Sequence, residues 1–263
     1  LGNGLKAIFQ AEWAFEGVEG TSYYEGSKVF RNRLAYAGLS GNWGTAAMGR
    51  QWTPYYGAVN KADIYNKGNI NPQYLGTTRT GNAISYVTPN WNGFSAAGVM
   101  TFDNGNNISV DDNKGVDTWQ VAANYDNGPF SLGAAYNKTN GAADNGAPAG
   151  TKIDDTTLWG IGGSYTFQEM FKIIAQYEDG SVPVDGMGND ADISEWTIAG
   201  EAYWGNNIFR ASYADYGKDL GDVADNIWAV GWQYNFSNRT RVYAEYFDGD
   251  AWGGYEIDED NPG

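Results

Sequence analysis

The feature that most constrains the fold is a rhythm of short and long connections between segments of about ten residues with alternating apolar side chains. The short connections are residues 40–44, 89–93, 126–129, 168–170, 204–207 and 237–239. The long connections are residues 17–29, 54–81, 103–114, 139–155, 179–193 and 217–224. Tight turns at one end and long loops at the other are typical of an antiparallel up-and-down β-barrel in an outer membrane. The rhythm therefore predicts an all-β transmembrane barrel.

The alternation also predicts which face of each strand meets lipid. Residues 228–236 place Trp, Val, Trp, Tyr and Phe at every second position, with Ala, Gly, Gln and Asn between them. Residues 5–15, 119–125 and 130–137 follow the same pattern. In a membrane barrel the aromatic face meets lipid and the small polar face lines a wet lumen. A soluble β-sandwich binding protein, which would bury the aromatic face against a second sheet, stays open as an alternative.

The number of strands bears on closure of the barrel. Thirteen strands are expected, beginning near residues 5, 30, 45, 82, 94, 116, 130, 156, 171, 194, 208, 225 and 240. Bacterial single-chain barrels close with an even number of strands, and an open edge is not stable in lipid. We therefore expect residues 1–263 to be one barrel domain that lacks an odd number of strands, with no linker dividing it.

Composition excludes several classes of function. The sequence has no cysteine and no histidine, which removes thiol nucleophiles, Ser-His hydrolases and the common zinc sites. A net charge of −16 argues against nucleic acid as a partner, because phosphate binding needs a basic surface. No run of about 18 apolar residues could form a helical span. We expect a protein that is not an enzyme and has no cofactor.

Several sequence blocks resemble a known family. LGNGLKAIFQ at residues 1–10 resembles the end of the first hairpin of Gram-negative general (non-specific) porins. RLAYAGLSG at 33–41, WGTAAMGRQ at 43–51 and TPYYGAV at 53–59 are similar to proteobacterial porins of the Neisseria and Bordetella type. The match is specific over residues 1–59 and follows the strand rhythm beyond them.

The resemblance implies a fold, an assembly and a location. Members of that family are homotrimers of 16-stranded barrels in the outer membrane of Gram-negative bacteria. Ions and small hydrophilic solutes diffuse passively through each barrel. On that template the first strand and the last two strands are missing here. The template also has a third loop that folds inward and narrows the pore, and the longest connection, residues 54–81, is expected to be this constriction loop.

Charged residues beside this loop are the candidates for the pore constriction. Four arginines lie on the flanking strands, namely Arg31, Arg33, Arg50 and Arg79. By resemblance, Arg33 and Arg50 belong to the basic wall of the constriction. An arginine facing lipid at the midplane costs about 2–4 kcal/mol, so these side chains should point into the lumen. Asp63 is the best opposing charge, and Glu12 is a weaker one. Alternatively, the arginines only hydrogen-bond loop carbonyls and hold the loop in place.

Two expectations concern what passes through the pore. Local arginines should outweigh distant loop carboxylates, because salt screens charge over about 8 Å, and this favours a weak anion preference or none. A substrate-specific porin is the alternative. It would use a stacking surface for a sugar, built from Tyr55, Tyr56, Tyr65 and Tyr74.

The long connections are rich in acidic residues, with two or more carboxylates close together in several of them. They are Asp111 and Asp112, Asp154 and Asp155, Asp190 and Asp192, Asp219, Asp222 and Asp225, and Asp258 and Asp260. Such carboxylates suit Ca²⁺ or Mg²⁺ that bridges to lipopolysaccharide. No loop contains a complete calcium motif, so a solvated acidic surface is the simpler interpretation.

Overall fold

The computed structural model describes residues 2, 4–14, 31–66, 74–102, 115–140, 155–183, 190–216 and 226–249. The strands are β1 Lys6–Ala14, β2 Arg31–Gly41, β3 Gly44–Trp52, β4 Arg79–Thr80, β5 Ala83–Val87, β6 Phe94–Phe102, β7 Val116–Asn127, β8 Phe130–Thr139, β9 Thr156–Phe167, β10 Phe171–Pro183, β11 Asp190–Trp204, β12 Asn207–Tyr216, β13 Asn226–Ser237 and β14 Thr240–Gly249. One helix, α1 Pro54–Val59, follows β3.

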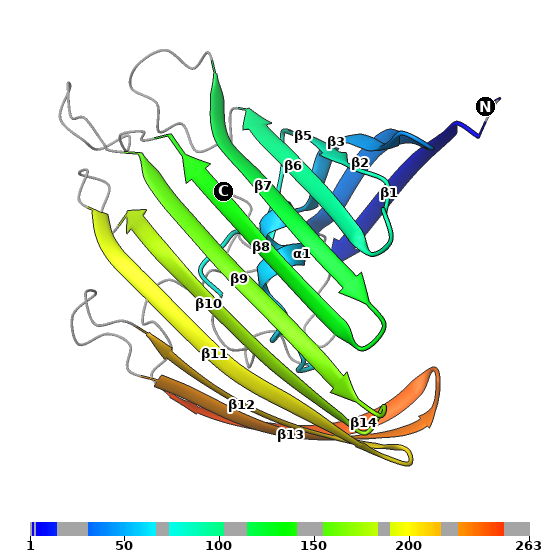
Figure 1. Ribbon diagram of the computed structural model, residues 1–263, viewed down its shortest axis with the longest axis vertical. Helices are drawn as coiled ribbons and strands as arrows, with labels where there is room; N and C mark the ends of the chain where they lie inside the picture. The colour runs from blue at the N-terminus through cyan, green and yellow to red at the C-terminus, as the bar shows by residue number, and fades with distance from the viewer. Residues whose placement is uncertain are drawn as a thin grey trace.

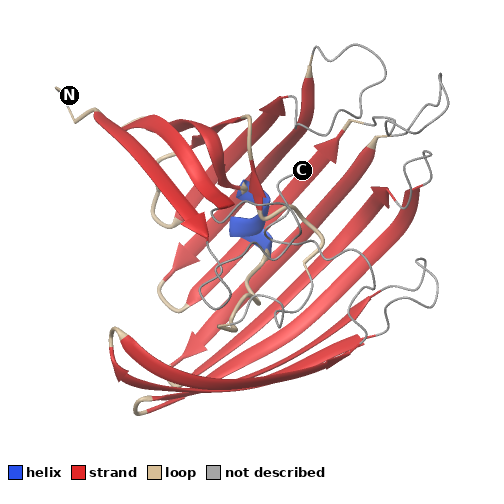
Figure 2. Ribbon diagram, turned by 180° about the vertical axis from the view of Figure 1, so that it is seen from behind, coloured by secondary structure: helices blue, strands red, loops and turns tan. Residues whose placement is uncertain are grey.

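The strands form one curved antiparallel sheet in chain order. Each strand pairs with the next from β1 to β14, except that the two-residue β4 pairs only with β3 and β5 takes its place on the path. The sheet curves around α1, which lies on its concave side (Figures 1 and 2). Without β4, 13 of the 14 strands lie on the path, which confirms the predicted strands. In the described part of the chain the sheet is open, with β1 and β14 at its edges.

The short connections are tight turns, as the rhythm predicts. Only residues 128–129 separate β7 from β8, and only residues 205–206 separate β11 from β12. Gly128 and Gly205 both have φ of 58°, in the left-handed region that glycine adopts without steric cost. These two turns lie at the same end of the sheet (Figure 1).

One predicted loop was wrong in its bounds. Residues 179–193 are expected to be a connection, yet β10 continues to Pro183 and β11 begins at Asp190. Their pairing runs without interruption from Phe171↔Ala202 to Pro183↔Asp190. Asp179, Gly180 and Ser181 are residues typical of turns, but an extended neighbouring strand satisfies their backbone groups and overrides that local preference.

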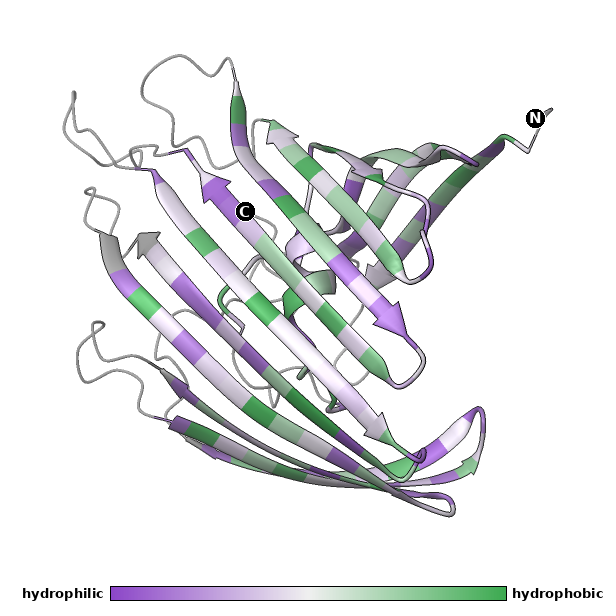
Figure 3. Ribbon diagram, in the orientation of Figure 1, coloured by the Kyte–Doolittle hydropathy of each residue, from purple (hydrophilic) through white to green (hydrophobic). Residues whose placement is uncertain are grey.

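Side-chain exposure confirms the predicted phase of the strands. On β13, Trp228 and Trp232 are 38% and 37% exposed, whereas Ala229 and Gln233 between them are 1% and 3% exposed. Apolar and polar residues alternate in the same way along the other strands (Figure 3). A soluble sandwich would cover the aromatic face with a second sheet, and the described residues form no such layer. No described helix is long and apolar enough to cross a membrane.

Candidate functional site

The concave face of the sheet holds a segment that we call the inner loop, residues 53–66 and 74–80. It leaves β3 at Thr53, forms α1 against the wall and returns through β4. Thr53 caps α1, because its Oγ1 accepts a hydrogen bond from Tyr56 N at 3.1 Å. Pro54 follows at the first helical position, where its missing N–H leaves no unpaired donor. The local sequence therefore starts a helix directly after the strand and turns the chain into the barrel.

Glycines on the wall allow the helix to lie close to the sheet. A Cβ on Gly162 of β9 would lie 2.1 Å from Val59 O, and a Cβ on Gly133 of β8 would lie 2.3 Å from Ala58 O. Gly160 lies beneath Tyr55, whose hydroxyl would be 2.7 Å from an added Cβ. A side chain at Gly133 or Gly162 would overlap the loop backbone, and one at Gly160 would overlap the side chains of Tyr55 and Val59. This glycine floor (Gly133, Gly160 and Gly162) thus sets how much of the lumen the inner loop occupies.

Polar side chains of the wall bind backbone N–H groups of the inner loop. Gln120 Oε1 of β7 accepts from Tyr55 N at 3.3 Å, and Gln176 Oε1 of β10 accepts from Ala62 N at 3.2 Å. Glu178 Oε2, also on β10, accepts from Leu75 N at 2.8 Å. Because all three groups belong to the lumen face of strands, they fix an irregular loop without regular sheet pairing.

A second anchor lies further along the curved sheet. Tyr65 Oη donates to Ala229 O at 2.8 Å and lies 2.9 Å from Ser212 Oγ. Asn66 N donates to Glu245 Oε1 of β14 at 2.8 Å. The inner loop therefore crosses the concave face from β3 to the β12–β14 region.

Arg33 faces the lumen because of a β-bulge. Glu12 pairs with Leu34 but Trp13 pairs with Asn32, so Arg33 is the extra residue on β2. Arg33 Nε lies 2.6 Å from Glu12 Oε1. Glu12 was expected to oppose the arginines across the pore. The structure instead places it beside Arg33 on the neighbouring strand, where it partly neutralises this wall.

Arg50 and Arg79 lie at the root of the inner loop. Arg50 is partly buried, and its Nη1 lies 3.9 Å from the position of a Cβ on Gly81. Arg79 is 5% exposed, and its guanidinium carbon lies 4.7 Å from the ring centre of Trp52. A guanidinium that is buried and stacked on an indole ring stabilises the start of the inner loop and has little contact with passing ions. The Arg31 side chain lies outside the described residues.

Asp63 is exposed on the inner loop, where its Oδ2 accepts a hydrogen bond from Tyr56 Oη. The candidates thus fall into separate groups. Arg33 and Glu12 lie on the β1–β2 wall, Arg50 and Arg79 at the loop root, and Asp63 on the loop itself.

Three cationic residues on the lumen side were not among the residues predicted for the constriction. They are Lys61 on the inner loop, Lys172 on β10 and Arg210 on β12. Arg210 Nε lies 3.0 Å from Glu201 Oε1, and Lys172 Nζ lies 3.9 Å from Glu201 Oε2. Strand phase already places Arg210 on the lumen face and could have found Lys172 in the same way, because each alternates with outward apolar neighbours. Lys61 has no such signal, since it lies in a loop.

Lys61 is a half-buried cation on the inner loop. Its Nζ donates to Gly57 O at 2.9 Å, and no ion pair of Lys61 occurs among the described residues. Burial lowers the pKa of Lys61, the carboxylate of Asp126 raises it, and the nearby Lys172 ammonium lowers it again. Lys61 therefore has both an acidic and a basic side chain in its surroundings.

The tyrosines proposed for a sugar-stacking surface are used in packing. Tyr55 and Tyr65 are 0% and 7% exposed. Tyr56 stacks on Trp52 with ring centres 4.9 Å apart and meets Tyr74 edge to face at 5.6 Å. Arg79 covers Trp52 as well. These contacts favour rigid loop placement over an aromatic surface open to solutes.

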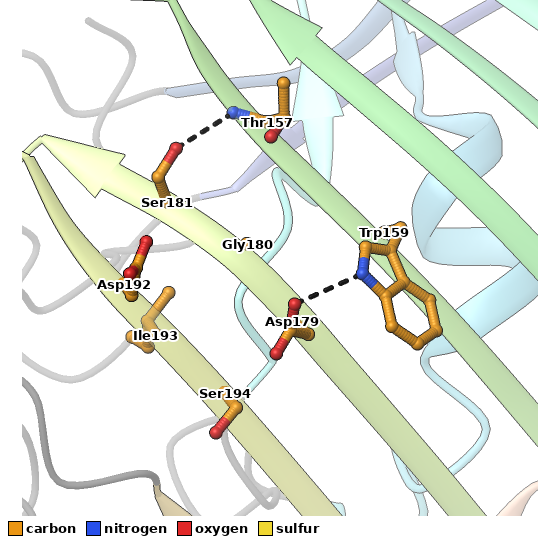
Figure 4. A pocket seen from close by; sticks show the side chains of 8 residues that line it. All are labelled: Thr157, Trp159, Asp179, Gly180, Ser181, Asp192, Ile193 and Ser194. Atoms are coloured by element: carbon orange, nitrogen blue, oxygen red, sulfur yellow. Dashed lines mark hydrogen bonds between the residues drawn. The ribbon is translucent and has the colours of Figure 1, made fainter.

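A pocket of about 540 Å³ lies away from the inner loop, on strands β9 to β11 (Figure 4). Trp159 and Asp179 line it, and Trp159 Nε1 donates to Asp179 Oδ1 at 3.2 Å. Their neighbours Leu158 and Glu178 are buried beneath the inner loop. Because adjacent residues of a strand point to opposite faces, this pocket is on the outer surface and not in the lumen.

Metal binding finds little support in the described part of the chain. No group of three acidic, histidine or cysteine side chains gathers there as a metal ion would need. The acidic segments around Asp111, Asp219 and Asp258 lie outside the described residues. Within the described residues, Asp155 lies 2.6 Å from Lys138 Nζ, so its charge is paired.

Comparison with known proteins gives a consistent result. A family model of the Gram-negative porin matches residues 1–251. Outer membrane porin protein 32 of Delftia acidovorans is 30% identical over 259 residues, covering 92% of this chain and 69% of the relative. An outer membrane porin protein of Bordetella pertussis is 25% identical over 287 residues, covering 93% of this chain and 72% of the relative.

Among solved structures, the anion-selective porin from Comamonas acidovorans superimposes with a TM-score of 0.77 and 26% identity, covering 95% of this chain and 76% of that one. The sequence match, the inner loop and the curved antiparallel sheet all indicate the same family. This chain belongs to the Gram-negative porin family and is an outer-membrane diffusion channel, not an enzyme.

Proposed function

We propose that this porin is a passive pore for small hydrophilic solutes with a weak preference for anions, and that the inner loop is its constriction. The observation that carries the proposal is the position of Lys61. Lys61 lies on the inner loop and forms no ion pair among the described residues, although both Asp126 and Lys172 act on its charge. A charge at the narrowest level acts on every passing ion at contact distance.

Ion pairs between neighbouring residues decide how strong the anion preference is. Glu12 lies against Arg33, and Glu201 lies between Lys172 and Arg210. Close opposite charges cancel much of each other's field, so the wall keeps only part of its positive charge. The net charge of −16 acts from further away and is screened over about 8 Å. The anion selectivity of the Comamonas acidovorans relative supports the same sign.

Removing Glu12 is expected to strengthen the anion preference. In Glu12→Gln, Arg33 keeps a hydrogen-bonding neighbour but loses the carboxylate 2.6 Å away, so its charge is fully presented to the lumen. Reversal potentials in a KCl gradient across a planar bilayer should move further toward the chloride potential than for wild type. An unchanged potential would mean that the Arg33 wall does not line the permeation path.

We also propose a homotrimer and contact with lipopolysaccharide. The outer face of β1 and β2 carries the exposed apolar side chains Phe9, Trp13 and Leu39 between small alanines, and a second copy of the chain could cover this surface. The outer pocket beside Trp159 offers an indole and carboxylates to lipid sugar groups. Native mass spectrometry from mild detergent should show three chains with bound lipopolysaccharide. A lipid-free monomer would contradict both proposals.

A further inference from the structure

Two glutamates beneath the inner loop play no part in lining the pore. Glu178 on β10 and Glu195 on β11 are both 0% exposed. They are direct register partners, so their side chains start from neighbouring positions on the same face. Opposed residues of antiparallel strands have Cβ atoms about 4.5–5.5 Å apart. The fold therefore brings two carboxyl groups together in a fully buried site.

Each carboxyl group has one oxygen bound and one oxygen unsatisfied. Glu178 Oε2 accepts from Leu75 N of the inner loop at 2.8 Å, and Glu195 Oε1 accepts from Thr197 Oγ1. Glu178 Oε1 and Glu195 Oε2 are buried and have no hydrogen-bond partner in the described structure. Buried oxygens without a donor are costly, so each one calls for an explanation.

Among the described residues, the groups around the two carboxyls supply no positive charge. The inner loop contributes Tyr55 and Tyr74, β9 contributes Gly160, β10 contributes Gln176, and β11 contributes Thr197. None of these can neutralise a carboxylate. Two like charges held together in a buried site cannot both ionise, whereas one proton shared between them supplies a donor to the unsatisfied oxygens.

We propose that Glu178 and Glu195 share one proton, and that this carboxyl pair is a latch that positions the inner loop in the lumen. With the proton bound, Glu178 holds Leu75 and the inner loop rests on the wall. When the proton leaves, two buried negative charges repel each other and draw in water, and the loop segment above them loosens. The inference rests on the proposed role of the inner loop as the constriction.

The direction of the pH dependence follows from this arrangement. The latch is complete at acidic and neutral pH and is lost as the solution becomes alkaline. Loss of one proton changes the ratio of loosened to latched loop by at most about tenfold per pH unit. Burial raises the pKa of Tyr55 and also that of Tyr74, so both phenols stay neutral over the same range. The tyrosines therefore do not account for an alkaline transition.

Single-channel recording of the purified porin at about pH 7 and about pH 10 tests the latch, since these values bracket the range in which buried carboxyls ionise. Wild type should give steady open-channel current at the lower pH and larger current fluctuations at the higher pH. Glu195→Gln carries a permanent donor and cannot ionise, so its current should stay steady at both. Glu178→Gln should behave in the same way.

The control is Glu201→Gln, on the same strand but ion-paired with Arg210. It should keep the alkaline transition of wild type. A Glu195→Gln channel that still becomes noisy at alkaline pH would overturn the proposal. So would one that is noisy at neutral pH, because that would mean that charge or a bound cation holds the loop. The reversal potential at neutral pH separates the two ideas, since failure of the latch leaves the anion preference intact.

Discussion

Gly162→Ala should lower the single-channel conductance and make the open current unsteady. The added Cβ would lie 2.1 Å from Val59 O, where the wall backbone leaves no room to yield. The inner loop must therefore move away from β9 and into the lumen. Overpacking of this kind costs about 1–3 kcal/mol. Because the sheet pairing is untouched, the barrel itself should fold, and the effect should appear in planar-bilayer recordings.

The adjacent residue provides a matched control. Gly163 faces outward, and a Cβ there would lie 3.4 Å from its nearest neighbours, which is ordinary contact. Gly163→Ala should keep wild-type conductance. Gly133→Ala, which would place a Cβ 2.3 Å from Ala58 O, should reproduce the Gly162→Ala result. Equal conductance of Gly162→Ala and Gly163→Ala would show that the position of α1 does not control permeation.

Lys61→Cys should make the ion preference switchable by chemical modification. The sequence has no cysteine, so a thiol reagent would react only at this position. A methanethiosulfonate that carries a sulfonate should shift the reversal potential toward the cation side and reduce the current. A reagent of similar size that carries trimethylammonium should restore the anion preference. The difference between the two reversal potentials reports the effect of charge alone, because the two adducts fill similar volumes.

Lys138→Cys is the control for this experiment. The residues on either side of Lys138 in β8 face the lumen, so the Lys138 side chain points to the outer face, where it pairs with Asp155. It therefore lies outside the permeation path. Modification there should leave both current and reversal potential unchanged. If labelled Lys61→Cys channels behaved like labelled Lys138→Cys channels, the inner loop would not line the narrowest part of the pore.

The architecture could be predicted because it follows from local patterns. Strand phase depends on a two-residue period and on turns of a few residues, and both are visible in the sequence. Residues 228–236 illustrate this, since each predicted outward residue from Trp228 to Trp232 is exposed and each predicted inward residue is not. The extent of β10 and β11 was missed because residues typical of turns are tolerated inside a long hairpin.

The site was harder to predict because it depends on contacts between distant segments. Simple alternation places Arg33 on the outward phase of Ala35, and only the bulge opposite Glu12 turns it into the lumen. Glu178 gives no local sign that Leu75, 103 residues away, will cover it. The glycine floor did carry a signal, since three glycines on the lumen phase of β8 and β9 indicate that a backbone approaches. Its partner could not be identified from sequence.

The most direct test of this account is the reversal potential of the wild-type porin in a KCl gradient across a planar bilayer. Lys61 near Lys172, with Arg33 on the facing wall, predicts a modest displacement toward the chloride potential. A displacement that shrinks at high ionic strength would agree with charges in a water-filled constriction. A reversal potential close to the potassium equilibrium potential would show that the acidic charge of the chain governs permeation. It would contradict the assignment of the inner loop as the selectivity element.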